Sequence, residues 1–184
     1  AGFDMHPHDN MEVVSIVLRG KLQHRDNLGN GDVLKPGDVQ KMTAGSGIIH
    51  SEFNPSDKEP VHFLQIWIIP NMLDLRPSYE QKAFNRKSMT NRLTLLVSPD
   101  GHNGSLEIHQ DAEIWQILLE ENKDTEFAIN HSRKIWIQVA EGSVSTNEHL
   151  LVAGDGLAVS DEEDIIRLRG IDKLSNIIIF NLRA

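Results

Sequence analysis

The amino-acid sequence predicts an all-β protein, a sandwich or barrel, with two similar halves. Its apolar segments are short and rich in Val, Ile, Leu and Trp, residue types that are enriched in strands. Gly, Asn, Asp and Pro recur between these segments at close spacing, as is typical of the turns in β-sheet proteins. A weak internal repeat relates the two halves of the 184-residue chain.

The expected strands follow one another along the chain with turns between them. They are EVVSIVLRGKLQH (12–24), PVHFLQIWIIP (60–70), NRLTLLV (91–97), SLEIHQ (105–110), EIWQILLE (113–120), KIWIQVAEGSV (134–144) and NIIIFNL (176–182). Turn residues gather at LGNGD, KPGD, SPDGHNG and AGDG. We expect one short helix over PSYEQKAF (77–84), in the polar stretch 71–91. Because that stretch lacks strand patterning, we place the domain boundary there, with domains 1–90 and 91–184.

The internal repeat pairs residues 12–22 with residues 134–144, so that Gly20 aligns with Gly142. LKPGD (34–38) then aligns with LVAGD (151–155). Each half therefore has a strand, a glycine turn, a second strand and a Gly-Asp turn. Any two β-hairpins share part of this pattern, so the repeat by itself predicts similar local structure in the two halves.

Charge and composition exclude several classes of function. The net charge of −9 and the pI near 5.4 disfavour nucleic acid or anionic lipid as a direct partner. The apolar runs VSIVL and NIIIF are too short to span a membrane and no charged-then-apolar leader precedes them, so we expect a soluble, cytoplasmic protein. The chain has no cysteine, which excludes disulfides and thiolate ligands. A metal here must bind nitrogen and oxygen.

The histidines offer such ligands. His6 and His8 flank a proline, which is excluded from helix interiors but tolerated at strand starts and edges. The segment is therefore expected to be extended, with both rings on one face about 7 Å apart. Glu12 has the same parity, and His50 shares parity with Glu52 after the glycine-rich turn TAGSG. Two such pairs on facing strands would make a four-ligand site.

The residue types favour some metal ions over others but do not identify a single one. A His-x-His pair alone is a weak indication of a metal site, because it is more often found on a solvated surface. The second pair, His50 with Glu52, strengthens the indication. Imidazole suits iron, zinc, copper and nickel, while an added carboxylate with open positions favours non-haem Fe(II); zinc and manganese stay open. Three histidines and one carboxylate leave a divalent ion with a net charge of +1, which can hold an anionic substrate oxygen.

Residues 2–55, from GFDMHPH to HSEFNP, resemble the metal-binding half of the pirins, which belong to the cupin superfamily. The resemblance continues through LQIWIIP, PSYEQKAF, LLVSPDG, SLEIHQDAEIW and IWIQVAEGSV to the C-terminus, so it covers essentially the whole chain. It is greatest to bacterial pirin-like proteins described as quercetin 2,3-dioxygenases, rather than to the eukaryotic nuclear pirins. The resemblance implies a bicupin, with two antiparallel, jelly-roll-like β-barrel domains.

The resemblance also implies a site and a reaction. The family's metal ligands fall on His6, His8, His50 and Glu52, around one divalent ion that we expect to be Fe(II), with zinc or manganese as alternatives. Glu12 occupies the position from which other cupins take their carboxylate, so it is the alternative ligand; otherwise it would accept a hydrogen bond from a ligand imidazole. The implied reaction is cleavage of a flavonol such as quercetin by O2, releasing carbon monoxide and a depside, with Glu52 as the candidate base.

Two other functions are open at this stage. One is a metal-containing regulatory module that binds a protein partner without turnover. The other is an isomerase or another small-molecule enzyme that uses zinc or manganese. The second half carries no counterpart of the His50 and Glu52 pair after AGDG, so we expect the C-terminal barrel to be free of metal. Pirins carry a segment before the point where this chain begins, at AGFDMHPH, and we expect such a segment in a longer protein; without it the first barrel would be more open.

The remaining histidines and the tryptophans are expected to be structural. His62 shares a strand face with Leu64 and Ile66, where a hydrogen-bonded core position is favoured over a pocket-lining one. We expect the acidic run DEED (161–164) to be a solvated turn rather than a calcium site. Five further histidines are expected at the surface or in structural roles, and three tryptophans in the core, although an aromatic wall near the metal would suit a flat substrate. These residues are His24, His102, His109, His131, His149, Trp67, Trp115 and Trp136.

Overall fold

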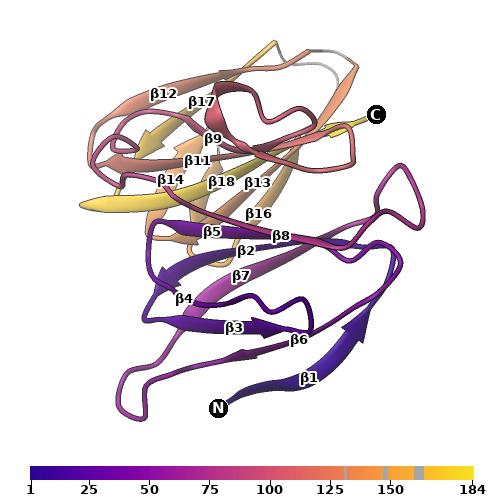
Figure 1. The fold of residues 1–184 in the computed structure, drawn as a ribbon. Coiled ribbons are helices and arrows are strands. Elements are labelled where there is room, and N and C mark those ends of the chain that lie inside the picture. Colours follow the sequence, from indigo (N-terminus) through magenta and orange to yellow (C-terminus); the bar gives the residue numbers. More distant parts are fainter. Residues whose placement is uncertain (131, 147–148, 160–163) are drawn as a thin grey trace. The chain divides into compact units, whose positions relative to one another are not determined.

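The computed structural model describes residues 1–130, 132–146, 149–159 and 164–184 and consists almost entirely of β-strands (Figure 1). This confirms the all-β prediction. The chain divides into two compact units, Ala1–Phe84 with Leu106–Gln110 and Asn85–Ser105 with Asp111–Ala184. Within the described ranges, no helix is long and apolar enough to cross a membrane. The predictions for His131 and for residues 161–163 fall outside those ranges.

The first unit contains two four-stranded antiparallel sheets, with strand orders β1-β6-β3-β4 and β7-β2-β5-β8. The strands are β1 (Gly2–His8), β2 (Glu12–Arg19), β3 (Leu22–Asp26), β4 (Gly31–Leu34), β5 (Asp38–Thr43), β6 (Ile48–Phe53), β7 (His62–Ile68), β8 (Ser78–Ala83) and the short β10 (Leu106–Glu107). Side chains of the two sheets meet in the interior, where Val17 of β2 packs with Leu22 and Leu34. The unit is a two-layered β-structure with its core between the sheets.

A glycine-rich turn fixes the start of β6. Gly45 and Gly47 both have positive φ, +50° and +133°, a region that favours glycine. A β-carbon on Gly45 would also collide with the backbone carbonyl of Leu75. The turn therefore needs glycine at residue 45 on both grounds, and it directs β6 along β1 and β3.

The second unit also consists of antiparallel strands, which run in the order β9-β11-β18-β13-β16 in one sheet and β12-β17-β14-β15 in the other. The elements are β9 (Thr94–Ser98), the 3₁₀ turn η1 (His102–Gly104), β11 (Ala112–Glu120), β12 (Asp124–Ala128), β13 (Arg133–Glu141), β14 (Ser143–Thr146), β15 (His149–Val152), β16 (Gly156–Val159), β17 (Ile165–Gly170) and β18 (Leu174–Arg183). In the described part of this unit, a large, mostly aliphatic cluster of buried side chains includes Ile117, Ile137 and Ile179.

The structure confirms the predicted repeat at its glycines. Gly20 and Gly142 have φ of +74° and +77°, and each joins two successive strands. Gly37 and Gly154 have φ of +100° and +97°. The aligned glycines thus share left-handed backbone conformations, which explains why the two halves carry glycine at the same repeat positions.

The predicted helix at residues 77–84 is wrong, because β8 occupies Ser78–Ala83. It pairs with β5 from Asp38 opposite Ala83 to Thr43 opposite Ser78. The hydroxyl of Tyr79 donates to Oε1 of Gln81 at 2.8 Å, as expected for two side chains on one face of a strand. Strands are recognised in a sequence by alternating polar and apolar residues. In β8 both faces carry mostly polar side chains, so this alternation is absent from the sequence.

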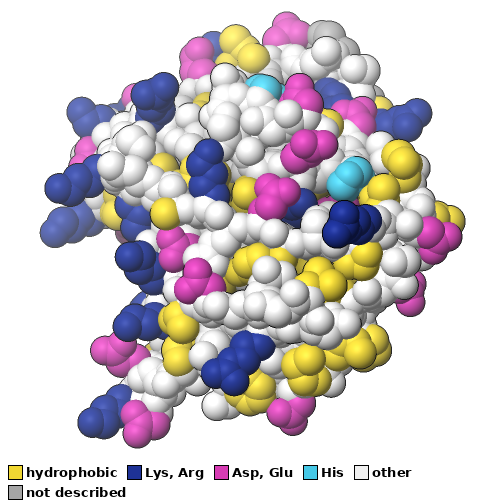
Figure 2. Space-filling view, in the orientation of Figure 1, with side chains coloured by type: hydrophobic (Ala, Val, Ile, Leu, Met, Phe, Trp, Pro, Cys, Tyr) yellow, Lys and Arg dark blue, Asp and Glu magenta, His cyan; other side chains and the backbone are white. Residues whose placement is uncertain are grey.

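The prediction that the tryptophans lie in the core is wrong for two of the three. Trp67 is 56% exposed and Trp136 is 40% exposed, and each indole N–H donates to a glutamine two residues away on the same strand. Trp115 packs against the core of the second unit and contacts Phe127 edge-on. Figure 2 shows that hydrophobic side chains also reach the surface elsewhere, among charged side chains of both signs.

Candidate metal centre

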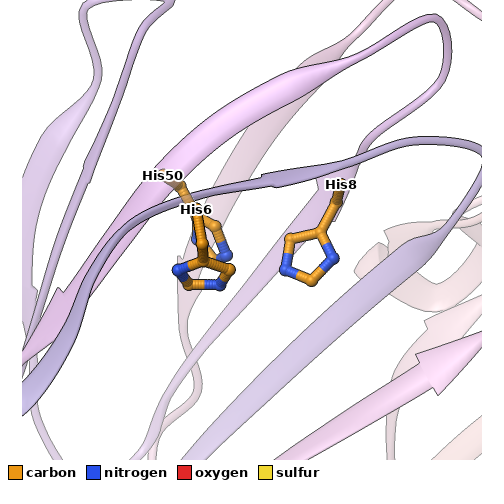
Figure 3. Close-up of side chains that lie close together, drawn as sticks. All are labelled: His6, His8 and His50. Atoms are coloured by element: carbon orange, nitrogen blue, oxygen red, sulfur yellow. The ribbon is translucent and has the colours of Figure 1, made fainter.

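Three histidines meet in the first unit because of the register between β1 and β6. The two strands pair antiparallel with His6 opposite His50 and His8 opposite Ile48. The ring centroids lie 4.4 Å apart for His6 and His50, 4.9 Å for His6 and His8, and 5.0 Å for His8 and His50. Figure 3 shows the three rings gathered on one side of β1. One ligand atom from each lies within 4.8 Å of the others, as a shared metal ion requires.

A second group overlaps with the first and shares His50 with it. His24, His50 and Glu52 also bring one ligand atom each within 4.8 Å of one another, and all three are buried. The register of β3 with β6, in which His24 lies opposite Glu52, produces this group. The expectation of a surface or structural role for His24 is therefore incomplete, because its ring is fully buried beside His50.

The Glu52 carboxylate is fixed by side chains from three strands of the facing sheet. Ser15 of β2 and Gln40 of β5 donate to its Oε1 at 3.3 and 2.9 Å, and Gln65 of β7 donates to its Oε2. Glu52 is 1% exposed, and a buried carboxylate needs such partners to stay charged. The network holds the Glu52 carboxyl group in place beside the histidines.

Unpaired nitrogens test whether these residues suit a metal ion. Among the described side chains, the buried nitrogen and oxygen atoms without a hydrogen-bond partner all belong to three histidines: Nε2 of His8, Nδ1 of His24, and both ring nitrogens of His50. Leaving a buried polar atom unpaired costs about 1–3 kcal/mol. A divalent cation would engage several of these lone pairs at once, and imidazole with one carboxylate is a donor set that iron, nickel and zinc accept. The residues therefore fit a metal ion.

The electrostatics of the cluster also favour neutral, ligating imidazoles. Burial, together with the nearby His6, His24 and His8, lowers the pKa of His50 from 6.5 to about 3. Burial and His6 lower the pKa of His8 as well, with Asp9 acting in the opposite sense. His50 is thus unprotonated at neutral pH, which is the form that binds metals.

Glu12, the alternative ligand, lies in neither of the two groups. Its carboxylate is fully buried, accepts a hydrogen bond from the hydroxyl of Thr43 at 2.9 Å and lies 2.9 Å from Nδ1 of His109. This gives His109 the structural role expected for it. The geometry favours Glu52 over Glu12 as the carboxylate beside the histidines.

The other histidines lie apart from the cluster. His62 is exposed at the start of β7, so the expectation that it is a hydrogen-bonded core residue is wrong. His102 is exposed and lies 2.6 Å from the carboxylate of Asp100, and His149 is exposed at the start of β15. These positions agree with surface roles for His102 and His149.

Two exposed aromatic side chains flank the histidines. Trp67 contacts the ring of His8 edge-on, with centroids 5.0 Å apart, and Phe3, which is 62% exposed, lies 6.3 Å from the ring of His6. The Trp67 indole N–H donates to Oε1 of Gln65 at 3.0 Å. Gln65 also donates to Glu52. Trp67 therefore contacts His8 directly and is linked to Glu52 through Gln65. The sequence favoured a core position for this tryptophan, and the position found corresponds to the alternative, an aromatic wall near the metal.

Known proteins resemble the chain over almost its whole length. Residues 1–68 match the family described as Pirin, and residues 95–182 match the one described as Quercetinase C-terminal cupin domain. The quercetin 2,3-dioxygenase of Escherichia coli K12 is 39% identical over 181 residues, which are 98% of this chain and 76% of that protein.

Solved structures agree with these sequence matches. A crystal structure of the bacterial pirin YhhW from Escherichia coli, in complex with nickel(II), has a TM-score of 0.90 and 38% identity, covering 99% of this chain and 76% of that one. A quercetin 2,3-dioxygenase from Acinetobacter baumannii, at 21% identity and a TM-score of 0.80 over 99% of this chain and 68% of that one, shares the fold. The bicupin fold is thereby confirmed, and the chain belongs to the pirin family of the cupin superfamily.

Proposed function

We propose that the protein is a metal-dependent dioxygenase that cleaves a flavonol such as quercetin with O2, and that its metal is Fe(II). The observation that carries this proposal is the meeting of His6, His8 and His50 beside the buried carboxylate of Glu52, with histidine nitrogens left unpaired. The names of its relatives support the reaction class, and the nickel complex of a relative supports a divalent ion.

In this proposal His6, His8, His50 and Glu52 hold one ion. When bound, a divalent cation lowers the pKa of a hydroxyl that it contacts and orients the reactants. The three histidines are neutral donors, so the site with Glu52 keeps a net positive charge that suits an anionic ring oxygen. The hydrogen bonds from Ser15, Gln40 and Gln65 fix the carboxylate during the reaction.

An apolar cavity beside Glu52 suits a flat aromatic substrate. It has a volume of about 450 Å³, and the residues that line it include Phe3, Leu22, Val61, Phe63 and Glu52. None of the three histidines lines it, so Glu52 is the residue that the cavity shares with the candidate centre. Small-molecule sites are commonly cavities of this size with apolar walls and a few polar groups. A flavonol whose rings contact Phe3 and Phe63 would bring a hydroxyl toward Glu52, which would accept its proton.

The direct test is turnover by the metal-loaded protein. The protein is purified anaerobically and loaded with Fe(II), and quercetin absorbance and oxygen uptake are followed together. We expect both signals to require the metal, to be lost in His50→Ala, and to persist in His62→Ala, which removes an exposed histidine away from the cluster. Equal turnover by the wild type and His50→Ala would contradict the proposal.

A regulatory role that involves a protein partner is the second candidate. Its support is a run of exposed apolar side chains after β7, where Ile69, Met72 and Leu73 are 71%, 57% and 69% exposed. Exposed apolar patches often mark protein contacts. Tight metal binding without any oxygen uptake in the test above would favour this candidate over the enzyme.

A further inference from the structure

The proposed ion leaves two of the unpaired nitrogens unexplained. An ion bound by the histidines would engage Nε2 of His8 and one ring nitrogen of His50. The other ring nitrogen of His50 and Nδ1 of His24 would still lack partners in the buried interior. His24 belongs to none of the ligand positions that the family resemblance implies, so its burial in this place needs a separate explanation.

The surroundings of His24 fix both its orientation and its tautomer. Its Nε2 lies 3.0 Å from Oδ2 of Asp26, a carboxylate that can only accept, so the proton of the neutral ring resides on Nε2. The ring stacks on Tyr79, with centroids 4.5 Å and planes 21° apart. Asp26 is held in turn by the backbone N–H groups of Leu28 and Asn30, both at 2.9 Å. The lone pair of His24 must therefore be on Nδ1.

We propose that His24 is a positioning residue for the metal centre, whose Nδ1 accepts the ring N–H of His50 while the other nitrogen of His50 faces the ion. The two ring centroids are 5.4 Å apart and the planes are inclined by 46°, and one ligand atom of each ring lies within 4.8 Å of the other. Because neither ring nitrogen of His50 has a hydrogen-bond partner, rotation of the His50 ring completes the hydrogen bond while His24 stays in place. Asp26, His24 and His50 then form a chain that ends at the metal. This inference rests on the metal-binding part of the proposed function and not on turnover.

The hydrogen bonds already made in the cluster favour His24 over Glu52 as the acceptor of the His50 ring N–H. A metal-bound histidine almost always donates its second N–H to a carboxylate, a carbonyl or water. The Glu52 carboxylate already accepts from three side chains and is itself a ligand of the proposed ion, whereas Nδ1 of His24 accepts from none. A single arrangement thus gives a partner to every one of the buried unpaired nitrogens: two on the ion and two in the hydrogen bond between His50 and His24.

Two variants of His24 separate this role from simple packing. His24→Phe keeps a ring that can stack on Tyr79 but removes both nitrogens, and His24→Gln keeps a side-chain oxygen that can accept from His50. His102→Phe is the matched control, because it removes another histidine paired with an aspartate, in the second unit. Unfolding of each protein in EDTA shows whether the variants fold.

The measurements are nickel(II) affinity by calorimetry and imidazole N–H signals by NMR in the diamagnetic zinc(II) form. We expect the wild type to show slowly exchanging ring N–H protons from His24 and His50, which disappear in His24→Phe and persist in His102→Phe. Nickel affinity should fall about 10- to 100-fold in His24→Phe and recover in His24→Gln. Unchanged affinity and an unchanged His50 N–H signal in His24→Phe would overturn the proposal, as would failure of folded His24→Gln to recover affinity. Binding of nickel without quercetin turnover would contradict only the proposed enzyme.

Discussion

Replacing His50 with leucine should weaken the metal site and at the same time change how stability depends on pH. The wild-type side chain is fully buried, has two unpaired nitrogens and has a pKa lowered from 6.5 to about 3. Between these two pH values the unfolded chain binds a proton at this residue that the folded protein does not. Folding stability therefore falls as the pH drops below 6.5, and the leucine variant lacks this loss.

The size of the effect follows from the shift. Each pKa unit corresponds to about 1.4 kcal/mol, so at pH 5 the wild-type histidine costs about 2 kcal/mol of stability relative to pH 7. At pH 7 two effects of opposite sign change the free energy of unfolding of the variant. Removing two unpaired polar atoms raises it by about 1–3 kcal/mol each, and imperfect packing of the leucine lowers it by about 1–3 kcal/mol. Packing is the same at both pH values, so the difference between them isolates the titration.

The assay is urea unfolding of both proteins in EDTA, at pH 7 and at pH 5. We expect His50→Leu to gain about 2 kcal/mol over the wild type on going from pH 7 to pH 5, with His62→Leu as the control for loss of one exposed histidine. Nickel(II) at 100 times its dissociation constant should stabilise the wild type by about 2.7 kcal/mol and the variant by much less. A stability difference that does not change with pH would falsify the account of His50 as a buried, neutral ligand.

Four further outcomes are expected. EDTA should abolish quercetin-dependent oxygen uptake, and added Fe(II) should restore it; activity that survives chelation would contradict a metal-dependent reaction. Phe3→Ala should weaken quercetin binding up to about tenfold, from the loss of an aromatic contact in the proposed cavity, in an absorbance titration, while leaving nickel affinity unchanged. Gln40→Leu removes a buried donor to Glu52 and should lower the free energy of unfolding by about 1.5–3 kcal/mol. Gly45→Ala should lower the urea midpoint more than Gly29→Ala, because both need positive φ but only the former meets a backbone carbonyl.

Part of the candidate centre could be predicted because side chains alternate along strands. His6 and His8 share a face, and so do His50 and Glu52, whatever the strands pair with. The register that sets His6 opposite His50 could not be read from the sequence, since the two strands are far apart in the chain and nothing local specifies their pairing. The resemblance to pirins, rather than the pattern itself, joined the two pairs into one site.

His24 shows why a further residue of the centre was missed. The sequence does contain a relevant feature, because His24 stands two residues before Asp26 and therefore shares a strand face with it. That segment reads as turn chemistry because Asp26 does organise the hairpin, through the backbone N–H groups of Leu28 and Asn30. Oδ1 of Asp26 accepts from the turn alone, whereas Oδ2 contacts both the Asn30 side chain of the turn and the buried histidine. Only the fold reveals the contact with the histidine.

The two halves of the repeat share glycine turns but differ in the side chains that they bury. The described interior of the second unit contains a large apolar cluster that includes Ile117, Ile137 and Ile179. In the first unit the buried polar side chains of His24, His50 and Glu52 occupy part of the interior, beside apolar clusters such as those that contain Val13 and Val17. Buried polar groups contribute less to stability than apolar packing unless each is paired. A bound metal ion would provide that pairing, so the residues that make the first unit suited to chemistry also make its stability depend on the ion.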